Sequence, residues 1–450
     1  MLPSLLFLSC STDSVKTVAT PTAETATTVD PMILTMQKEA LSSTQGMSML
    51  VELCDDIGNR IAGSPRFEQA VDWGVKTMRN IGLENVEKHP IRVKYWKRGE
   101  ERLTMISPRQ ESLGVLGLGM GISTPPSGIE ADAVVLSSFD ELETVDVREK
   151  MVVFNVPFTN YGETVAYRTQ GPTRAAEKGA VAALVRSVGP VSLYTPHTGS
   201  TRYNEDWKIP AAAITLEDAE RFARYQQRGK PLRLSLFLES QEEDNIPTSN
   251  VIGDILGADR PDQIVVMGCH LDSWDVGQGA QDDGAGCAIV LDAARVIAQQ
   301  EQRPKRTIRT ILYSNEENGL AGAKAYANER GERHLAAIEA DIGAGAPMYF
   351  SYQLPEEHPG IDSWMPHLEA SLQSLGLGDF QEGYSGADVG QLVKTGTVGF
   401  GLRMDTTNYW PIHHTHADTI DKIELKNLQK DTAAVVSLVW VLANMPLETD

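Results

Sequence analysis

The sequence lacks long apolar runs and has a deficit of basic residues. No run of about 18 apolar residues occurs, so we expect no transmembrane helix in the mature protein. Only 40 basic residues stand against 61 acidic ones, which gives a formal net charge of −21. An excess of negative charge repels phosphate backbones and anionic lipid, so we expect no nucleic-acid partner. Cations and metal ions are the better partners for such a chain.

Cysteine is also scarce. Apart from Cys10, the chain holds Cys54, Cys269 and Cys287, an odd number with no repeated spacing. This count indicates neither a disulfide framework nor a zinc ribbon. We therefore expect these three residues to be buried thiols.

The amino terminus carries a short apolar run. Residues 1–10 read MLPSLLFLSC, and Ser, Thr, Ala and Val dominate the stretch from there to Asp30. The pattern is similar to the end of a bacterial lipoprotein signal peptide and its tether, although no basic residue precedes the apolar run. It predicts an exported protein that is periplasmic, secreted or a cell-surface lipoprotein, with any membrane contact made through a lipid on Cys10. The alternative is a disordered cytosolic tail with an incidental cysteine.

At 450 residues, the chain is long enough for about two or three domains. Helical spacing covers Met32–Ile57 and Arg66–Ile81, and alternation predicts antiparallel edge strands at Val86–Val93 and Arg102–Ile106. The Gly-rich stretch from Leu113 to Gly128 reads as a linker. We predict a leader over residues 1–30, a main domain formed by 31–128 and 241–450, and an inserted domain over 129–240.

The predicted insert forms its own series of strands and helices. None of its strands ends in a cluster of metal-binding residue types, so we expect it to act as a lid, a substrate-selecting module or an interface. The strands are predicted at 133–136, 151–155, 181–185, 211–214 and 232–238, and the helices at 164–177 and 216–227.

After Asp244 the chain alternates between strands and helices. This order predicts an α/β fold with a mostly parallel central sheet flanked by helices. The strands are predicted at 264–269, 307–313, 337–341 and 398–402, and the helices at 287–299, 321–329, 363–375 and 425–445. In such sheets ligands bind beyond the carboxyl ends of the strands.

Four successive strand ends are followed by carboxylates or imidazoles. A single acidic pair in so acidic a chain is usually a solvated helix start, but the shared edge makes a joint site the better interpretation. A buried edge with this many carboxylates requires cations to neutralise it. The segments are 270–272, 282–283, 316–317, Asp341 and 413–418, the last with three histidines.

Histidine and carboxylate ligands without cysteine suit zinc in a catalytic site with open positions. A carboxylate can bridge two ions about 3.5–4 Å apart, a geometry that serves to activate a hydrolytic water. The residues therefore indicate metal-assisted hydrolysis.

The same segments resemble the co-catalytic dinuclear zinc exopeptidases, and within that family they are most similar to the carboxypeptidase Q group. The resemblance covers residues 246–423 and, more loosely, 40–106. Its motifs are His270-Leu271-Asp272 running into Asp282-Asp283-Gly284, Asn315-Glu316-Glu317, His414-Thr415-x-x-Asp418, and Asn59-Arg60 near the amino terminus. It implies the zinc-exopeptidase fold, with the insert at the place where several members carry a β-rich, protease-associated-like domain.

Residue by residue, the resemblance implies two zinc ions per chain. His270 and Asp341 would bind one ion, Glu317 and His414 the other, and Asp282 would bridge them. His414 is preferred to His413 and His416 because it lies four residues before Asp418. The family pattern also implies a cis peptide bond between Asp282 and Asp283.

The resemblance also implies catalytic roles for two further carboxylates. Asp272 would orient the first zinc site, and Glu316 would act as general base.

The implied activity is exopeptidase hydrolysis of dipeptides or short peptides. Aminopeptidase, dipeptidase and carboxypeptidase action all remain open, and a homodimer is kept as one option for the oligomeric state. The alternatives are a receptor-like ectodomain without catalysis and a glutaminyl cyclase that works with one zinc. The full set of ligand types argues against both.

Overall fold

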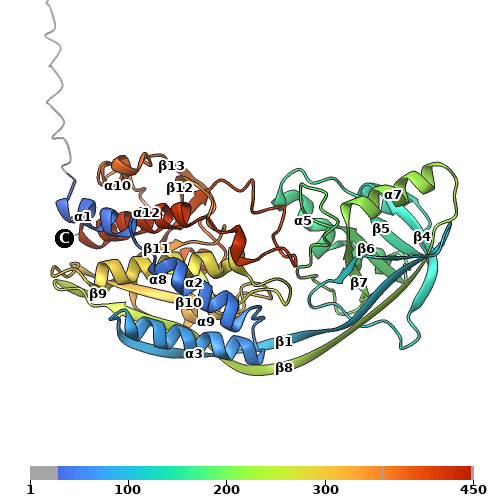
Figure 1. Cartoon of the computed structure of the whole chain (residues 1–450), viewed down its shortest axis with the longest axis horizontal. Coiled ribbons are helices and arrows are strands. Elements are labelled where there is room, and N and C mark those ends of the chain that lie inside the picture. Colours follow the sequence, from blue (N-terminus) through green and yellow to red (C-terminus); the bar gives the residue numbers. More distant parts are fainter. Residues whose placement is uncertain (1–28, 357, 447–450) are drawn as a thin grey trace, which may run out of the picture.

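The computed structural model describes residues 29–356 and 358–446, so the predicted leader and Cys10 lie outside the described residues. Two lobes are joined by a long antiparallel ribbon of β1 (Glu84–Ser107) and β8 (Arg233–Ile255), which runs along the base of Figure 1. We call the part with β9–β14, α1–α3 and α8–α12 the large lobe. The part with β2–β7 and α4–α7 is the small lobe.

The large lobe is built on a mixed sheet in which four neighbouring strands are parallel. The order is β13 (Phe380–Glu382), β12 (Pro347–Gln353), β14 (Val398–Met404), β11 (Arg333–Glu339), β9 (Arg260–His270), β10 (Arg306–Tyr313) and β8. Strands β14, β11, β9 and β10 are parallel, while β12 runs antiparallel to β14 and β8 runs antiparallel to β10. The mostly parallel central sheet is confirmed, and its four parallel strands bring their carboxyl ends to one edge.

Helices cover both faces of this sheet. Val265 and Met267 of β9 enter one core, and Ile264 and Val266 enter the other, because successive strand residues point to opposite faces. Burial on both faces explains why residues 264–269 of β9 read as a nearly continuous apolar run. The first core holds α1 (Pro31–Ala40), α2 (Gln45–Val51), α3 (Pro65–Asn80), α8 (Ala285–Ala298), α10 (Met365–Leu372) and α12 (Leu425–Asn444), and the second holds α9 (Ala321–Glu329) and α11 (Val389–Val393).

Two local predictions near the amino terminus were wrong. Met32–Ile57 is not one helix, because α1 and α2 are separated at residues 41–44 and a π-helical turn follows over Glu52–Ile57. At the break, the Ser43 hydroxyl accepts the N–H of Gln45, one of the local bonds by which such residues compete with a helix. The edge strands predicted at 86–93 and 102–106 are one strand, since the polar residues between them also pair with β8.

The small lobe has its own sheet and its own buried cores. Its strands continue from β8 in the order β4 (Ile129–Leu136), β5 (Met151–Phe154), β6 (Ala182–Arg186), β7 (Ala211–Ile214) and β3 (Val115–Gly117), and β2 (Glu111–Leu113) pairs with β1. Two apolar clusters lie on the two faces of this sheet. The helices are α4 (Phe139–Thr144), α5 (Tyr161–Thr169), α6 (Gly171–Glu177) and α7 (Leu216–Gln227). The expected linker at 113–128 therefore contributes a strand to the lobe.

Membrane-spanning helices are absent from the described part of the chain, where no helix is both long and apolar enough to cross a bilayer.

Candidate metal centre

The predicted ligand residues meet at the carboxyl edge of the parallel strands. His270 ends β9, and Asp282 lies in the turn that leads into α8. Glu317 follows β10, and Asp341 lies two residues beyond β11. His414 comes from the loop after β14. Because the strands are parallel, residues far apart in the sequence converge here.

Asp282 lies between two histidines and turns one carboxylate oxygen toward each. Its Oδ1 is 3.2 Å from His270 Nε2, and its Oδ2 is 3.1 Å from His414 Nε2. His270 Nε2 is also 3.2 Å from Asp341 Oδ1, and His414 Nε2 is 3.1 Å from Glu317 Oε2. The centre thus has two halves, each with one imidazole and one carboxylate, that share Asp282.

The site is buried, and its charges shift one another's proton affinity. Burial opposes the charge on His414, but Glu317 and Asp282 raise its pKa to about 9. Burial likewise opposes charge on His270, but Asp341 and Asp282 raise the pKa well above its usual value. Burial would raise the pKa of Asp282, yet its hydrogen bonds with His270 and His414 hold it well below the usual range. The cluster therefore favours bound cations or protons.

The donor atoms fit divalent metal ions. His270, Asp282 and Asp341 offer atoms that lie within 4.8 Å of one another, and Asp282, His413 and His414 do the same. Glu317 Oε1 is buried and has no hydrogen-bond partner among the described residues, as expected for an atom that faces a cation. Imidazole and carboxylate donors without thiolate match zinc with open coordination positions.

Asp272 links the His270 half of the centre to Glu316. Its backbone carbonyl lies 2.9 Å from His270 Nδ1, so it accepts the Nδ1–H and leaves Nε2 facing the carboxylates. Its carboxylate Oδ1 accepts the backbone N–H of Glu316 at 3.1 Å. Burial raises the pKa of Glu316 well above its usual value, and the charges of Asp341 and Glu317 add to that rise. A carboxylate with a raised pKa is suited to accept and return a proton near neutral pH.

A buried arginine shapes the loop that runs from His270 to Asp282. The Arg60 guanidinium donates to the carbonyls of Leu271 at 2.6 Å, Gln278 at 2.9 Å and Gly279 at 3.0 Å. The peptide bond between Asp282 and Asp283 is cis, as the family pattern implies.

The three histidines at 413, 414 and 416 have different surroundings. His414 contacts two carboxylates, whereas His413 stacks on it with ring centroids 3.6 Å apart and lies 3.5 Å from Asp282 Oδ2. His416 is exposed. The backbone of His414 has a φ of 62°, in the left-handed region that non-glycine residues rarely adopt. Such conformations persist where the surroundings hold them and are frequent at functional sites.

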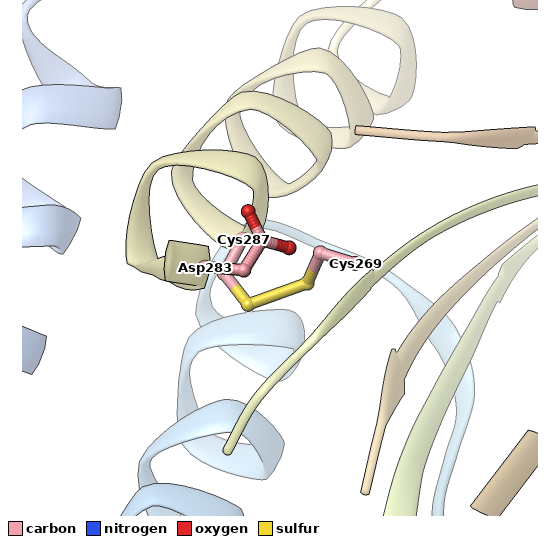
Figure 2. Close-up of side chains that lie close together, drawn as sticks. All are labelled: Cys269, Asp283 and Cys287. Atoms are coloured by element: carbon pink, nitrogen blue, oxygen red, sulfur yellow. A yellow bond between two sulfur atoms is a disulfide. The ribbon is translucent and has the colours of Figure 1, made fainter. Parts of the chain in front are cut away.

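The expectation of three buried thiols was wrong for two of them. Cys269 and Cys287 form a disulfide with their Cα atoms 5.2 Å apart, while Cys54 is free and buried. Figure 2 shows the disulfide beside Asp283, whose Oδ2 accepts the N–H of His270 at 3.1 Å. Cys269, Asp283 and Cys287 lie close enough together to suggest a metal site. Because the two sulfur atoms are bonded to each other, however, they offer no thiolate ligand to a metal ion. The disulfide instead fastens the end of β9 to the start of α8.

A cleft of about 1030 Å³ opens over the centre. Large-lobe and small-lobe residues both line it, among them Glu316, Asp341, His414, Trp410, Tyr161 and Arg168. Tyr161 and Arg168 come from α5, and the Tyr161 ring stacks on Trp410 with centroids 4.8 Å apart. The sequence patterns did not single out these small-lobe residues, because no strand of the insert ends in a recognisable ligand cluster.

Comparisons with known proteins agree on one family. The profile of Peptidase family M28 matches residues 250–439. Carboxypeptidase Q of Xenopus laevis is 38% identical over 395 residues, covering 86% of this chain and 83% of that protein. Carboxypeptidase Q of Homo sapiens is 37% identical over 402 residues, covering 88% of this chain and 84% of that protein.

Solved structures show the same fold. The Peptidase M28 precursor from Shewanella amazonensis SB2B is 35% identical, with a TM-score of 0.89, and the match covers 93% of this chain and 97% of that one. A zinc aminopeptidase from Bacillus subtilis is 20% identical, with a TM-score of 0.67, and the match covers 90% of this chain and 96% of that one. The chain therefore belongs to peptidase family M28, the co-catalytic zinc exopeptidases, and is a metallo-exopeptidase.

Proposed function

We propose that the protein is a dinuclear zinc exopeptidase that hydrolyses the peptide bond of dipeptides or short peptides. The observation that carries the proposal is the shared carboxylate of Asp282, with one oxygen 3.2 Å from His270 Nε2 and the other 3.1 Å from His414 Nε2. A carboxylate that lies between two pairs, each made of one imidazole and one carboxylate, is placed to bridge two metal ions.

Five residues would hold the two ions. His270 and Asp341 would bind one, Glu317 and His414 the other, and Asp282 would bridge them. Bound zinc would supply Lewis-acid polarisation of the scissile carbonyl and a lowered pKa for the attacking water. No thiolate competes for the ions, because the two nearest cysteines are joined in a disulfide.

Glu316 would move the proton. It lines the cleft beside Glu317, and its backbone is fixed by the Asp272 carboxylate. In its ionised form it would accept a proton from the attacking water and return it to the leaving amine. Asp272 would orient His270 through its carbonyl and hold the Glu316 segment through its carboxylate. Its part is positioning, since its own carboxylate makes the bond to the Glu316 N–H.

Carboxylates at the floor of the cleft would attract the ammonium group of a substrate with a free amino end. The test is hydrolysis by the zinc-loaded protein of matched dipeptides with a free amino end, an acetylated amino end or an amidated carboxyl end. Loss only on acetylation identifies an aminopeptidase, loss with either block a dipeptidase, and loss only on amidation a carboxypeptidase. Cleavage of none of the three contradicts the proposed activity on short peptides.

We also propose that residues 129–240 are an inserted, protease-associated-like domain within a peptidase domain formed by 31–128 and 241–450. The small-lobe cores support a separate folding unit, to which Leu113 and Leu118 of the preceding segment also contribute. Expression of 129–240 alone tests the division. A cooperative thermal transition supports an independent domain, and an unfolded fragment contradicts these boundaries.

Export is the proposed localisation. The Cys269–Cys287 disulfide suits an oxidising compartment, where such bonds persist. A further relative, 25% identical over 357 residues and covering 77% of this chain and 66% of its own, is named a probable lipoprotein aminopeptidase of Mycobacterium tuberculosis. Cell fractionation of the wild type and a Cys10→Ser variant distinguishes a lipid-tethered protein from a soluble exported one. Recovery of both only in the cytosol contradicts export.

A further inference from the structure

A buried loop of the small lobe reaches the metal centre. Residues 197–201, which we call the contact loop, lie between β6 and β7. His197, Thr198 and Thr201 are 2%, 0% and 3% exposed, although the loop has no regular secondary structure. Burial of irregular backbone requires partners for its polar groups. Some of those partners lie within the small lobe, and others lie at His414 and Glu317.

Thr198 holds His414 from two directions. Its N–H donates to the His414 carbonyl at 3.0 Å, and its own carbonyl lies 3.3 Å from His414 Nδ1. Arg168 Nη1 also lies 3.3 Å from His414 Nδ1, so this nitrogen has both a donor and an acceptor beside it. The tautomer that donates Nδ1–H to Thr198 leaves the lone pair of Nε2 facing Asp282 and Glu317, and this is the tautomer that a metal ligand needs. The left-handed backbone of His414 costs about 1–3 kcal/mol unless its surroundings hold it.

Ser200 holds the segment that carries Glu317. Its Oγ donates to the Glu317 carbonyl at 2.6 Å and lies 2.9 Å from Asn318 Oδ1. Glu317 follows β10 in a stretch without regular structure, so a bond from outside the large lobe helps to fix its direction.

The contact loop is itself anchored within the small lobe. Gly119 donates its N–H to the Gly199 carbonyl at 3.0 Å and accepts the N–H of Thr201 at 2.9 Å. Gly199 has a φ of 129°, and a Cβ there would overlap the guanidinium of Arg168. Arg168 Nη1 in turn donates to the Thr198 carbonyl at 3.2 Å. Only glycine fits at position 199 without moving this arginine.

The contacts are one-sided. Among the described residues, no hydrogen bond joins the contact loop to His270 or Asp341, whereas it meets both His414 and Glu317. The two halves of the centre therefore differ. Within residues 29–356 and 358–446, the His270 half has hydrogen bonds from the large lobe, whereas the His414 half has them from both lobes.

We propose that the contact loop is a positioning element for the metal ion of the His414 half, so that binding of this one ion depends on the docked small lobe. The inference rests on the proposed dinuclear centre. Thr198 and Ser200 do not touch the reacting atoms, and they act through the orientation of His414 and Glu317. Occupation of this half and docking of the small lobe would then stabilise each other.

The test measures zinc affinity, which a merely structural change far from the site would leave unaltered. Ser200→Ala is made in two full-length backgrounds, His270→Ala, which leaves the His414 half, and His414→Ala, which leaves the His270 half. Zinc binding is followed by competition with a chelator. Ser371→Ala is the matched control, because Ser371 is 1% exposed and its Oγ donates to the Leu368 carbonyl at 2.7 Å in α10.

We expect Ser200→Ala to weaken zinc binding about 10-fold or more in the His270→Ala background, the usual effect of losing a group that orients a ligand. In the His414→Ala background the change in zinc affinity should stay below about 2-fold. Ser371→Ala should change the zinc affinity by less than about 2-fold in either background. In the otherwise wild-type chain, kcat should fall while KM stays nearly constant.

Equal zinc affinity with and without Ser200→Ala, in a chain whose wild type binds two ions and cleaves peptides, overturns the inference and leaves the proposed function intact. A wild-type chain that binds fewer than two ions overturns both. Gly199→Ala gives a second test, since displacement of the contact loop should weaken binding of the same zinc ion. If that variant fails to fold, Ser200→Ala decides the question alone.

Discussion

Asp418 holds Asp282 through the backbone. The Oδ2 atom of Asp418 accepts the N–H of Asp282 at 3.2 Å, and its Oδ1 accepts the N–H of Gln281 at 2.7 Å. The residue that joins the two halves of the centre is thus fixed by a carboxylate from the segment that carries His414. Burial raises the pKa of Asp418 to about 7, so the two N–H bonds only partly offset the cost of its charge.

Replacing Asp418 by Asn should loosen this arrangement. An amide can accept only through its oxygen, so one of the two N–H groups would face an NH₂ group instead. We expect zinc affinity and kcat each to fall about 10-fold to 100-fold. Chelator competition and steady-state kinetics measure the two effects. Asp421→Asn is the control, because Asp421 is exposed in the same segment. Wild-type affinity and rate in Asp418→Asn would show that the backbone of Asp282 needs no such support.

The role of Glu316 is tested by Glu316→Gln. Glutamine keeps the size of the side chain but cannot take a proton from water, so kcat should fall by about 100-fold or more. Zinc content should stay at two per chain, because Glu316 is not among the proposed ligands. Retained activity with equal zinc content removes Glu316 from the role of base. Glu317→Gln is the comparison variant, since it should lose zinc as well as activity.

Stability of the metal-free protein should fall as pH rises from 6.5 to 9. Burial raises the folded-state pKa of Asp418 to about 7 and of Glu339 to about 8, and His414 reaches about 9 because Glu317 and Asp282 outweigh its burial. These values exceed those of the unfolded chain, so the folded state binds more protons, and the stabilisation is lost as pH rises through the folded pKa values. His197, with a pKa lowered to about 3 by burial, acts in the opposite sense only below about pH 6.5.

Thermal denaturation at pH 6.5 and pH 9 measures this effect. We expect the Tm of the metal-free protein to be lower at pH 9 by at least about 2 °C. Two equivalents of zinc should reduce the difference, since an ion replaces the proton on His414 and the added positive charge lowers the pKa of the nearby carboxyl groups. A metal-free Tm that is equal or higher at pH 9 contradicts the assigned pKa shifts.

The disulfide gives a separate stability prediction. Cys269 and Cys287 are 18 residues apart, and closing a loop of this length stabilises a protein by about 3 kcal/mol in the chain-entropy description. Denaturation with and without reductant should therefore show a lower Tm for the reduced wild type. The Cys269→Ser/Cys287→Ser double variant should not respond to reductant. A wild-type Tm that reductant leaves unchanged would mean that the two thiols are free.

Much of the large lobe follows from local pattern. The helix predicted at 321–329 matches α9, and the strands predicted at 264–269, 307–313 and 398–402 lie within β9, β10 and β14. Burial on two faces leaves the clearest apolar run in β9. The alternation at 86–93 and 102–106 located the two ends of β1. The highly charged stretch between them, residues 94–101, concealed that they form one strand.

Long-range relations could be read from the sequence only where sheet topology dictates them. Cys269 and Cys287 meet because β9 ends beside the start of α8, and a spacing of 18 residues does not reveal that proximity. The convergence of His270, Asp282 and His414 could be predicted, because strand ends share an edge in a parallel sheet. The approach of Thr198 and Ser200 could not, since it depends on how one lobe docks against the other.

The number of zinc ions needed for activity tests the central claim most directly. Metal-free protein is titrated with zinc, and both bound zinc and hydrolysis of an unblocked dipeptide are measured in each sample. The proposed site predicts that activity reaches its maximum at two bound ions per chain and that His270→Ala and His414→Ala each bind only one. Full activity at one ion per chain, or hydrolysis that is independent of zinc, would contradict a dinuclear centre bridged by Asp282.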